Sequence, residues 1–234
     1  MADRRKRIWI TRTQPAAAGT AVQVRERGHD PWVTPLLEVR PLVAEPLDLT
    51  GVGALAFTSN NGVRAFCALS AERQIRVFAV GAATAKAAWA AGFRRVLSSD
   101  RDVSVLAQGI MDRSREITGT VLHPGALEPA GDLVAALESH GIAARGVAVY
   151  DTCPTEISED QLAEMAEMDV ALIHSAKAAQ VLADLLRQHA LPGLAVAGLS
   201  RAAIKPLARS ALGWKAAATK PLESALLDLI DQAP

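Results

Sequence analysis

Short apolar runs alternate with helical patterns along almost the whole chain of 234 residues. This alternation is typical of parallel strands joined by crossover helices. We expect ten strands, at residues 7–11, 32–36, 54–57, 76–80, 94–97, 120–122, 143–149, 169–173, 194–197 and 214–217. Ten short strands are too many for one ordinary open sheet, so the pattern predicts two sheets.

The chain also repeats itself. The segment that begins "WITRTQPAAAGTAVQ" aligns with the segment that begins "LHPGALEPAGDLVAA" at a constant shift of 113 residues, which pairs Gly28 with Gly141. Further on, "FTS" at 57–59 aligns with "IHS" at 173–175. The two copies predict one α/β plan of about 115 residues that is used twice.

Proline-containing stretches, "LLEVRPLVAEPLDLT" and "VYDTCPTEIS", follow the second strand of each copy. Proline lacks the backbone donor and disfavours helix at the residue before it, so both stretches are expected to be extended connectors. We therefore predict an α/β fold of two doubly wound domains with mainly parallel sheets of about five strands. Residues 1–37 with 153–234 would form the first domain, 42–149 the second, and 38–41 and 150–152 the connectors.

Composition and charge exclude several classes of protein. The formal net charge is zero, which argues against a general binder of nucleic acids or membrane surfaces. No segment approaches the roughly 18 uninterrupted apolar residues of a membrane span, and the apolar stretch after "ADRRKR" is too short for a signal peptide. We expect a cytoplasmic protein without a membrane or nucleic-acid partner, with Cys67 and Cys153 as free thiols.

The predicted strand ends are rich in small hydroxyl residues, glycines and cations. In a parallel α/β sheet, ligands bind beyond the carboxyl ends of the strands, where the N-H groups of helix N-termini favour anions. These residues predict a site for a multiply anionic ligand in a cleft between the domains: Thr11, Arg12, Thr58, Ser59, Asn60, Gly81, Thr84, Ser175, Gly198, Ser200 and Arg201. Helix capping explains the hydroxyl residues equally well, and the two roles are compatible.

Motifs for nucleotides and metals are missing from the sequence. "VGAATAKAAWAAG" lacks the G-x-G-x-x-G spacing, and the Walker loop, H-E-x-x-H and G-x-S-x-G are absent. We therefore expect no cofactor and no metal. His123 and His174, at strand ends, are interpreted as polar turn residues rather than bases.

Tyr150 is the only tyrosine, and it lies where "VAVYDT" enters a predicted connector. Between two domains, a tyrosine can donate a proton or a hydrogen bond while its ring packs on an apolar face. The alternative is that Tyr150 only seals the hinge between the domains.

The motifs "ITR", "FTSNNGV", "VGAATAKAA" and "VAVYDT", with a weaker "AVAGLS", resemble uroporphyrinogen-III synthases in their order, spacing and duplication over essentially the whole chain. The resemblance implies two α/β domains joined by a two-stranded connector. It also implies that hydroxymethylbilane loses its hydroxyl and closes into a ring with inversion of the last pyrrole, through a proposed spiro intermediate and without a cofactor. This is a step of haem biosynthesis.

The resemblance also implies roles for individual residues. Tyr150 matches the tyrosine proposed to help the hydroxyl leave, Thr84 matches the threonine of the first glycine turn, and Ser59 and Ser175 match the two strand-end serines. Two positions depart from the pattern, because His174 and Arg201 stand where threonine is usual. The cations that we consider for the substrate carboxylates are Arg12, Arg64, Lys86, Lys177, Arg201 and Lys220.

Two functions remain open at this point. The first is a monomeric synthase that acts on the linear tetrapyrrole. The alternative is a non-catalytic, two-lobed protein of the same fold that binds a tetrapyrrole or another small molecule. A Tyr150 that points into the cleft near Thr84 and Ser200 favours catalysis, whereas burial in one lobe favours binding.

Overall fold

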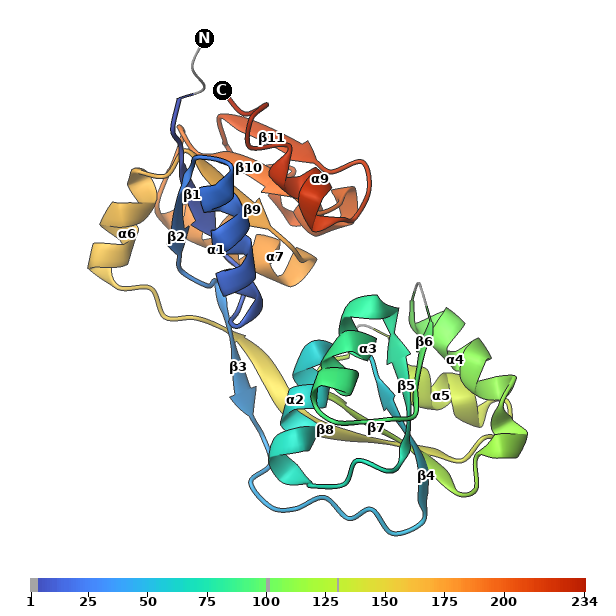
Figure 1. The fold of residues 1–234 in the computed structure, drawn as a ribbon. Helices are drawn as coiled ribbons and strands as arrows, with labels where there is room; N and C mark the ends of the chain where they lie inside the picture. Colours follow the sequence, from blue (N-terminus) through green and yellow to red (C-terminus); the bar gives the residue numbers. More distant parts are fainter. Residues whose placement is uncertain (1–3, 100–101, 130) are drawn as a thin grey trace. The chain divides into compact units, whose positions relative to one another are not determined.

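The computed structural model describes residues 4–99, 102–129 and 131–234 (Figure 1). The chain forms two compact units: unit 1 comprises Met1–Glu38 and Cys153–Pro234, and unit 2 comprises Val39–Thr152. Each unit contains a mainly parallel sheet with helices on both faces. This architecture confirms the predicted α/β fold class.

The sheet of unit 1 has five strands in the order β11-β10-β9-β1-β2. All its strand pairs are parallel. The strands are β1 (Arg7–Ile10), β2 (Asp30–Val33), β9 (Val170–Ile173), β10 (Ala195–Gly198) and β11 (Trp214–Ala217). Side chains alternate between the two faces of a strand, so Ile8 and Ile10 enter one core while Trp9 enters the other.

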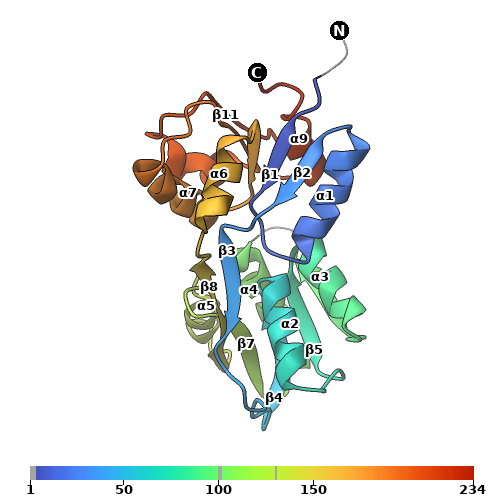
Figure 2. The ribbon, with the colours of Figure 1, turned by 90° about the vertical axis from the view of Figure 1, so that its left-hand side faces the viewer.

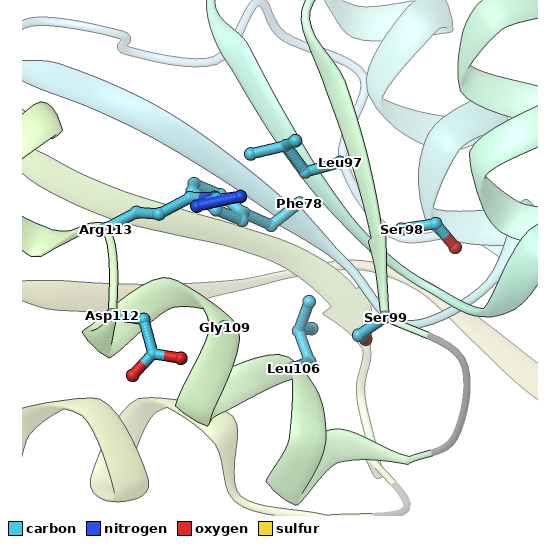
Figure 3. Close-up of a pocket in the computed structure, with 8 residues that line it drawn as sticks. All are labelled: Phe78, Leu97, Ser98, Ser99, Leu106, Gly109, Asp112 and Arg113. Carbon is cyan, nitrogen blue, oxygen red and sulfur yellow. The ribbon is translucent and has the colours of Figure 1, made fainter.

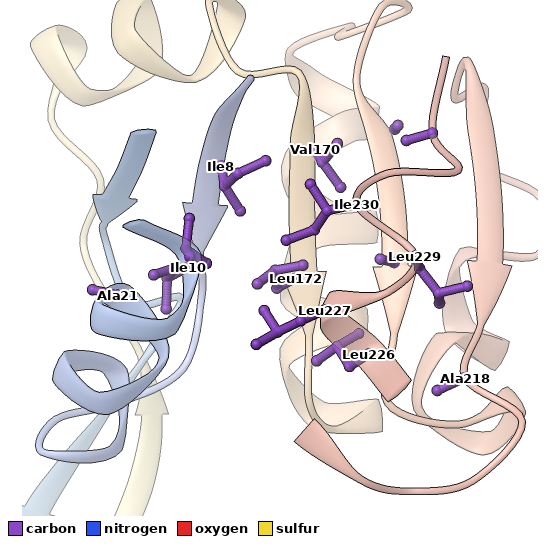
Figure 4. Close-up of a cluster of buried hydrophobic side chains, with 14 of the residues drawn as sticks. Ile8, Ile10, Ala21, Val170, Leu172, Ala218, Leu226, Leu227, Leu229 and Ile230 are labelled. Atoms are coloured by element: carbon purple, nitrogen blue, oxygen red, sulfur yellow. The ribbon is translucent and has the colours of Figure 1, made fainter. Parts of the chain in front are cut away.

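Helices α1 (Ala16–Glu26) and α9 (Glu223–Leu227) cover one face of this sheet. Figure 4 shows Ile8, Ile10 and Leu172 of the strands packed against Leu226 and Leu227 of α9. The other face is covered by α6 (Glu159–Ala166), α7 (Ala176–Gln188), α8 (Arg201–Ile204) and the 3-10 turn η2 (Lys205–Leu207). Both faces of the sheet are therefore buried, as a parallel sheet requires.

The sheet of unit 2 has six strands in the order β3-β8-β7-β4-β5-β6, one more than predicted. Its strands are β3 (Leu37–Pro41), β4 (Val52–Phe57), β5 (Arg76–Val80), β6 (Val96–Ser99), β7 (Thr120–Ala126) and β8 (Ala144–Pro154). The additional strand is β3, for which the prolines in and around its sequence had predicted a connector. The backbone N-H of Leu42 donates to Val149 O at 3.1 Å and that of Thr155 to Leu36 O at 3.0 Å, so β3 runs antiparallel to β8.

Helices α2 (Asn60–Leu69) and α3 (Gly81–Ala90) lie together on one face of this sheet (Figure 2). The rings of Phe57, Phe66 and Phe93 meet beneath them, with centroids 5.7–6.0 Å apart. Helices α4 (Val103–Met111) and α5 (Leu133–Glu138) cover the other face, and the 3-10 turn η1 (Ser114–Glu116) follows α4. Among the described residues, no helix is long and apolar enough to cross a membrane.

The internal repeat is visible in the turns that follow α1 and α5. Gly28 and Gly141 both have a positive φ, at 83° and 73°, a conformation that favours glycine. Gly28 N-H donates to Arg25 O and Gly141 N-H to Glu138 O, each at 2.9 Å. Donors and acceptors in the two turns differ by the same 113 positions as the sequence copies, so the shift corresponds to one repeated helix-to-strand turn.

Candidate active site

Ser59 and Tyr150 meet at the carboxyl end of β4 in unit 2. Ser59 follows the strand in an extended conformation, and its Oγ caps α2 by accepting the N-H of Gly62 at 3.0 Å. The hydroxyl of Tyr150, on β8, lies 2.7 Å from the same Oγ. Gly62 is required at this turn because a Cβ there would lie 2.7 Å from the carbonyl oxygen of Pro124. The capping serine thus has a phenol as its second partner.

Tyr150 belongs to unit 2 and is 6% exposed. It lies in the interior of a continuous strand and not in a loose connector, because β8 extends to Pro154. Burial raises the pKa of Tyr150, and the hydrogen bond with Ser59 partly opposes this. The phenol is therefore protonated at neutral pH. The ring is thus largely covered, while the hydroxyl of Tyr150 reaches the half-buried Ser59.

Two further residues predicted for the site belong to α3. This helix begins at Gly81, whose φ is +73°, and Thr84 lies in its first turn. Thr84 is 5% exposed, and its hydroxyl has no hydrogen-bond partner among the described residues. Thr58 is half-buried and Asn60 is exposed at the neighbouring turn. These side chains leave polar atoms for a ligand at the ends of β4 and β5.

Ser175 and Ser200 occupy turns in unit 1 that resemble the Ser59 turn. Ser175 Oγ accepts the N-H of Ala178 at 3.2 Å and Ser200 Oγ that of Ala203 at 3.1 Å. The capping interpretation is therefore confirmed for Ser59, Ser175 and Ser200, whereas Thr84 makes no such bond. Arg201 is exposed. Gly198 has no room for a Cβ, because the side chain of Ile204 lies too close to it.

Thr11 is fully buried, with no exposed surface. Its Oγ1 donates to the carbonyl oxygen of Leu172 at 2.6 Å, which ties the end of β1 to β9. This contact gives Thr11 a structural role in unit 1.

Arg12 is not a free cation, because its Nη1 lies 3.0 Å from Glu223 Oε2. Thr20 Oγ1 donates to Glu223 Oε1 at 2.5 Å, and His174 Nε2 lies 3.2 and 3.3 Å from the two carboxylate oxygens. One carboxylate thus gathers groups from the ends of β1 and β9 and from α1. The sequence analysis missed Glu223 and Thr20, since neither belongs to a motif nor follows one of the predicted strands directly.

The environment of Glu223 keeps it ionised. Burial alone raises the pKa of this carboxyl, but hydrogen bonds from His174 and Thr20 and the charges of His174 and Arg12 outweigh burial and hold the pKa at about 2. The second ring nitrogen of His174, Nδ1, is buried without a hydrogen-bond partner. His174 is therefore part of a charged cluster and not a simple turn residue.

The interpretation of His123 as a polar turn residue is wrong, because it lies inside β7 and is 6% exposed. Its Nδ1 lies 2.8 Å from the carbonyl oxygen of Ala56, on the neighbouring strand. The next residue, Pro124, has no backbone N-H with which to continue the β4-β7 ladder, so the imidazole replaces that donor. Burial lowers the pKa of His123, which favours the neutral ring. These contacts give His123 a structural role.

A pocket of about 180 Å³ lies between β6 and α4 in unit 2 (Figure 3). Asp112 and Arg113, which follow α4, supply its charged groups, and Phe78 and Leu97 supply apolar ones. None of the residues predicted for the site lines this pocket. Within the described parts of the chain, no group of three or more His, Cys, Asp or Glu residues is placed to hold a metal ion.

Comparison with known families identifies the family of the chain. A family model described as "Uroporphyrinogen-III synthase HemD" matches residues 19–228. The chain belongs to the uroporphyrinogen-III synthase family. Membership makes it a cyclising lyase of tetrapyrrole (haem) biosynthesis, whose reaction converts hydroxymethylbilane to uroporphyrinogen III with loss of water. The resemblance identified from the sequence motifs is thereby confirmed.

Solved structures support the fold of this uroporphyrinogen-III synthase family member. The uroporphyrinogen-III synthetase of Helicobacter pylori is 18% identical, with a TM-score of 0.72 over 99% of this chain and 100% of that one. A mutant uroporphyrinogen III synthase from the extremely thermophilic bacterium Thermus thermophilus is 16% identical, with a TM-score of 0.56 over 97% and 98% of the two chains. Comparison with curated proteins gives no match.

Proposed function

We propose that the hydroxyl pair of Tyr150 and Ser59 supplies the proton with which the hydroxyl group of hydroxymethylbilane leaves as water. The observation that carries this proposal is the 2.7 Å contact between the two side-chain oxygens at the carboxyl end of β4. A strand end is the usual place for ligand chemistry in a parallel α/β sheet.

The number of protons in this pair supports a role as proton donor. Two hydroxyl groups carry two protons, and their mutual hydrogen bond uses one. Ser59 Oγ also accepts the N-H of Gly62, which occupies a lone pair and no proton. One O-H therefore remains for another acceptor, whichever of the two residues donates. The raised pKa of Tyr150 keeps its proton in place at neutral pH.

The remaining predicted residues are proposed to hold the acetate and propionate groups of the substrate. Helices α2, α3 and α7 each begin shortly after the carboxyl end of a strand, and helix N-termini stabilise carboxylates. The enzyme must fold a flexible chain so that the substituted carbon of the last ring meets the electrophile. The residues proposed to bind substrate are Arg12, Thr58, Ser59, Asn60, Gly81, Thr84, Ser175, Gly198, Ser200 and Arg201.

Freshly prepared hydroxymethylbilane tests the function directly. After the reaction and oxidation of the products, the type I and type III ring isomers are separated by chromatography. The proposal predicts predominantly type III from the wild-type chain. Type I alone, formed at the spontaneous rate, would instead indicate the non-catalytic binding protein.

We also propose that the protein acts as a monomer in the cytoplasm, without a nucleic-acid partner. The balanced charge of the chain supports the absence of a nucleic-acid partner, and Cys67 and Cys153, which form no disulfide, support a cytoplasmic location. Size-exclusion chromatography with light scattering tests it. A mass near 24.6 kDa is expected for a monomer, and twice that mass would contradict it.

A further inference from the structure

Glu223 is the point where three donor side chains of unit 1 converge. Arg12 approaches one carboxylate oxygen at 3.0 Å, Thr20 the other at 2.5 Å, and His174 lies between 3.2 and 3.3 Å from both. These donors come from the end of β1, from α1 and from the end of β9, while Glu223 itself begins α9. Glu223 therefore connects elements that are separated in sequence but meet at the carboxyl edge of the sheet.

Arg12 keeps unused hydrogen-bonding capacity in this arrangement. A guanidinium has five N-H donors, and here only those on Nη1 contact Glu223 and Thr20. Its Nε and Nη2 donors have no partner among the described residues, and the side chain is 31% exposed. The edge formed by Nε and Nη2 has the planar, two-donor geometry that matches a carboxylate.

We propose that Glu223 is a positioning residue, which fixes the guanidinium of Arg12 through Nη1 and so leaves the Nε and Nη2 edge to bind a carboxylate of the substrate. This inference rests on the proposed function. A long arginine side chain that is ordered before the substrate arrives loses less freedom on binding, so the interaction gains affinity through preorganisation. The low pKa of Glu223 keeps its charge, and hence the orientation, through the neutral range.

His174 contacts the same carboxylate of Glu223 that holds Arg12. The family resemblance implies threonine at this position, and a threonine hydroxyl is too short to take the part of an imidazole. Here the ring donates through Nε2 to the carboxylate that also holds Arg12. His174 and Glu223 are thus expected to depend on each other in this chain.

Substitution of Glu223 separates positioning from simple stabilisation. Glu223→Gln keeps the size of the side chain but removes the charge that attracts Arg12. We expect its KM for hydroxymethylbilane to rise about tenfold, with kcat changed less than about threefold, because the affected contact binds the substrate and does not react. A matched control is Asp228→Asn, which removes another carboxylate at the C-terminal end of α9, 2.8 Å from Arg27, and should leave KM unchanged.

A double-mutant cycle with Arg12→Ala provides the decisive comparison. If Glu223 acts through Arg12, adding Glu223→Gln to Arg12→Ala raises KM no further. A KM for Glu223→Gln within twofold of the wild type, or effects that multiply in the double variant, would overturn the proposal. The thermal unfolding midpoint of each variant shows whether a change in KM comes from loss of folding.

The wild-type chain alone shows whether the proposed function fails, independently of the role of Glu223. A wild-type chain that forms only type I isomer refutes the proposed function before any variant is compared. In that case the same cycle is measured as the Kd for uroporphyrin III, by quenching of its fluorescence. Coupled losses of affinity in Glu223→Gln and Arg12→Ala would still support positioning, and independent losses would refute it.

Discussion

Tyr150 and Ser59 are joined by a 2.7 Å contact between their hydroxyl oxygens, although their strands are not neighbours. Tyr150 belongs to β8 and Ser59 follows β4, and β7 lies between these strands in the sheet. The register of β7 and β8 shifts between Gly125 and Ala126, so that Ala126 pairs with Tyr150 beyond the irregularity. Such an irregularity changes the direction of the side chains beside it. Tyr150 lies at this irregularity, and its side chain extends past β7 to Ser59.

Tyr150→Phe tests the chemical part of this contact. The variant keeps the buried ring but loses the hydroxyl, so we expect kcat to fall about 100-fold, the lower end of the usual contribution of a general acid. The free energy of unfolding should fall by only about 1 kcal/mol, the net value of one hydrogen bond. Steady-state kinetics and urea denaturation measure the two quantities. Unchanged turnover would rule out a catalytic role for Tyr150.

Ser59→Ala separates capping from catalysis. Loss of the cap on α2 should destabilise the chain by about 1 kcal/mol, and loss of the partner of Tyr150 should lower kcat as well. Ser158→Ala is the matched control, because Ser158 caps α6 through Gln161 N at 3.2 Å and has no predicted contact with the substrate. Equal kcat values in the two variants would show that Ser59 only caps its helix.

Stability should fall in acid because of Glu223. Its pKa is about 2 in the folded chain, against an ordinary value of 4.5, so the unfolded chain binds the proton more tightly. The stabilisation is therefore present above about pH 5 and disappears as the pH falls toward 2, by an amount on the order of 3 kcal/mol. Urea denaturation at several pH values should show that the free energy of unfolding of Glu223→Gln falls less steeply in acid than that of the wild type. The same acid dependence in both proteins would contradict the low pKa of Glu223.

Gly62→Ala is expected to destabilise unit 2. The new Cβ would lie 2.7 Å from a backbone carbonyl oxygen, that of Pro124, so the start of α2 must shift, at a cost of about 1–3 kcal/mol. Gly19→Ala is the control: this glycine is in α1 with no atom within 4 Å of a Cβ, so the variant should gain about 0.5–1 kcal/mol in helix propensity. Thermal unfolding that ranks the two variants in the opposite order would refute this account.

The sequence predicted those parts of the structure that depend on local periodicity. Apolar runs such as "ALAF" became buried strands, and the shift of 113 residues appears as matching turns at Gly28 and Gly141. The prediction missed β3 because its stretch is rich in proline, although the one proline within the strand, Pro41, is tolerated at the edge of the sheet. Glu223 was also missed, because its role depends on partners that lie up to 211 residues away in the chain.

The isomer ratio formed by the Tyr150→Phe variant, measured beside the wild type under identical conditions, tests whether the phenol of Tyr150 is needed for ring closure with inversion. The family resemblance implies that the ring can close without inversion in the absence of the enzyme, so a failing enzyme should release type I product. We expect predominantly type III from the wild type and a clear shift toward type I in the variant. The same high proportion of type III from both proteins, formed at the same rate, would contradict this expectation.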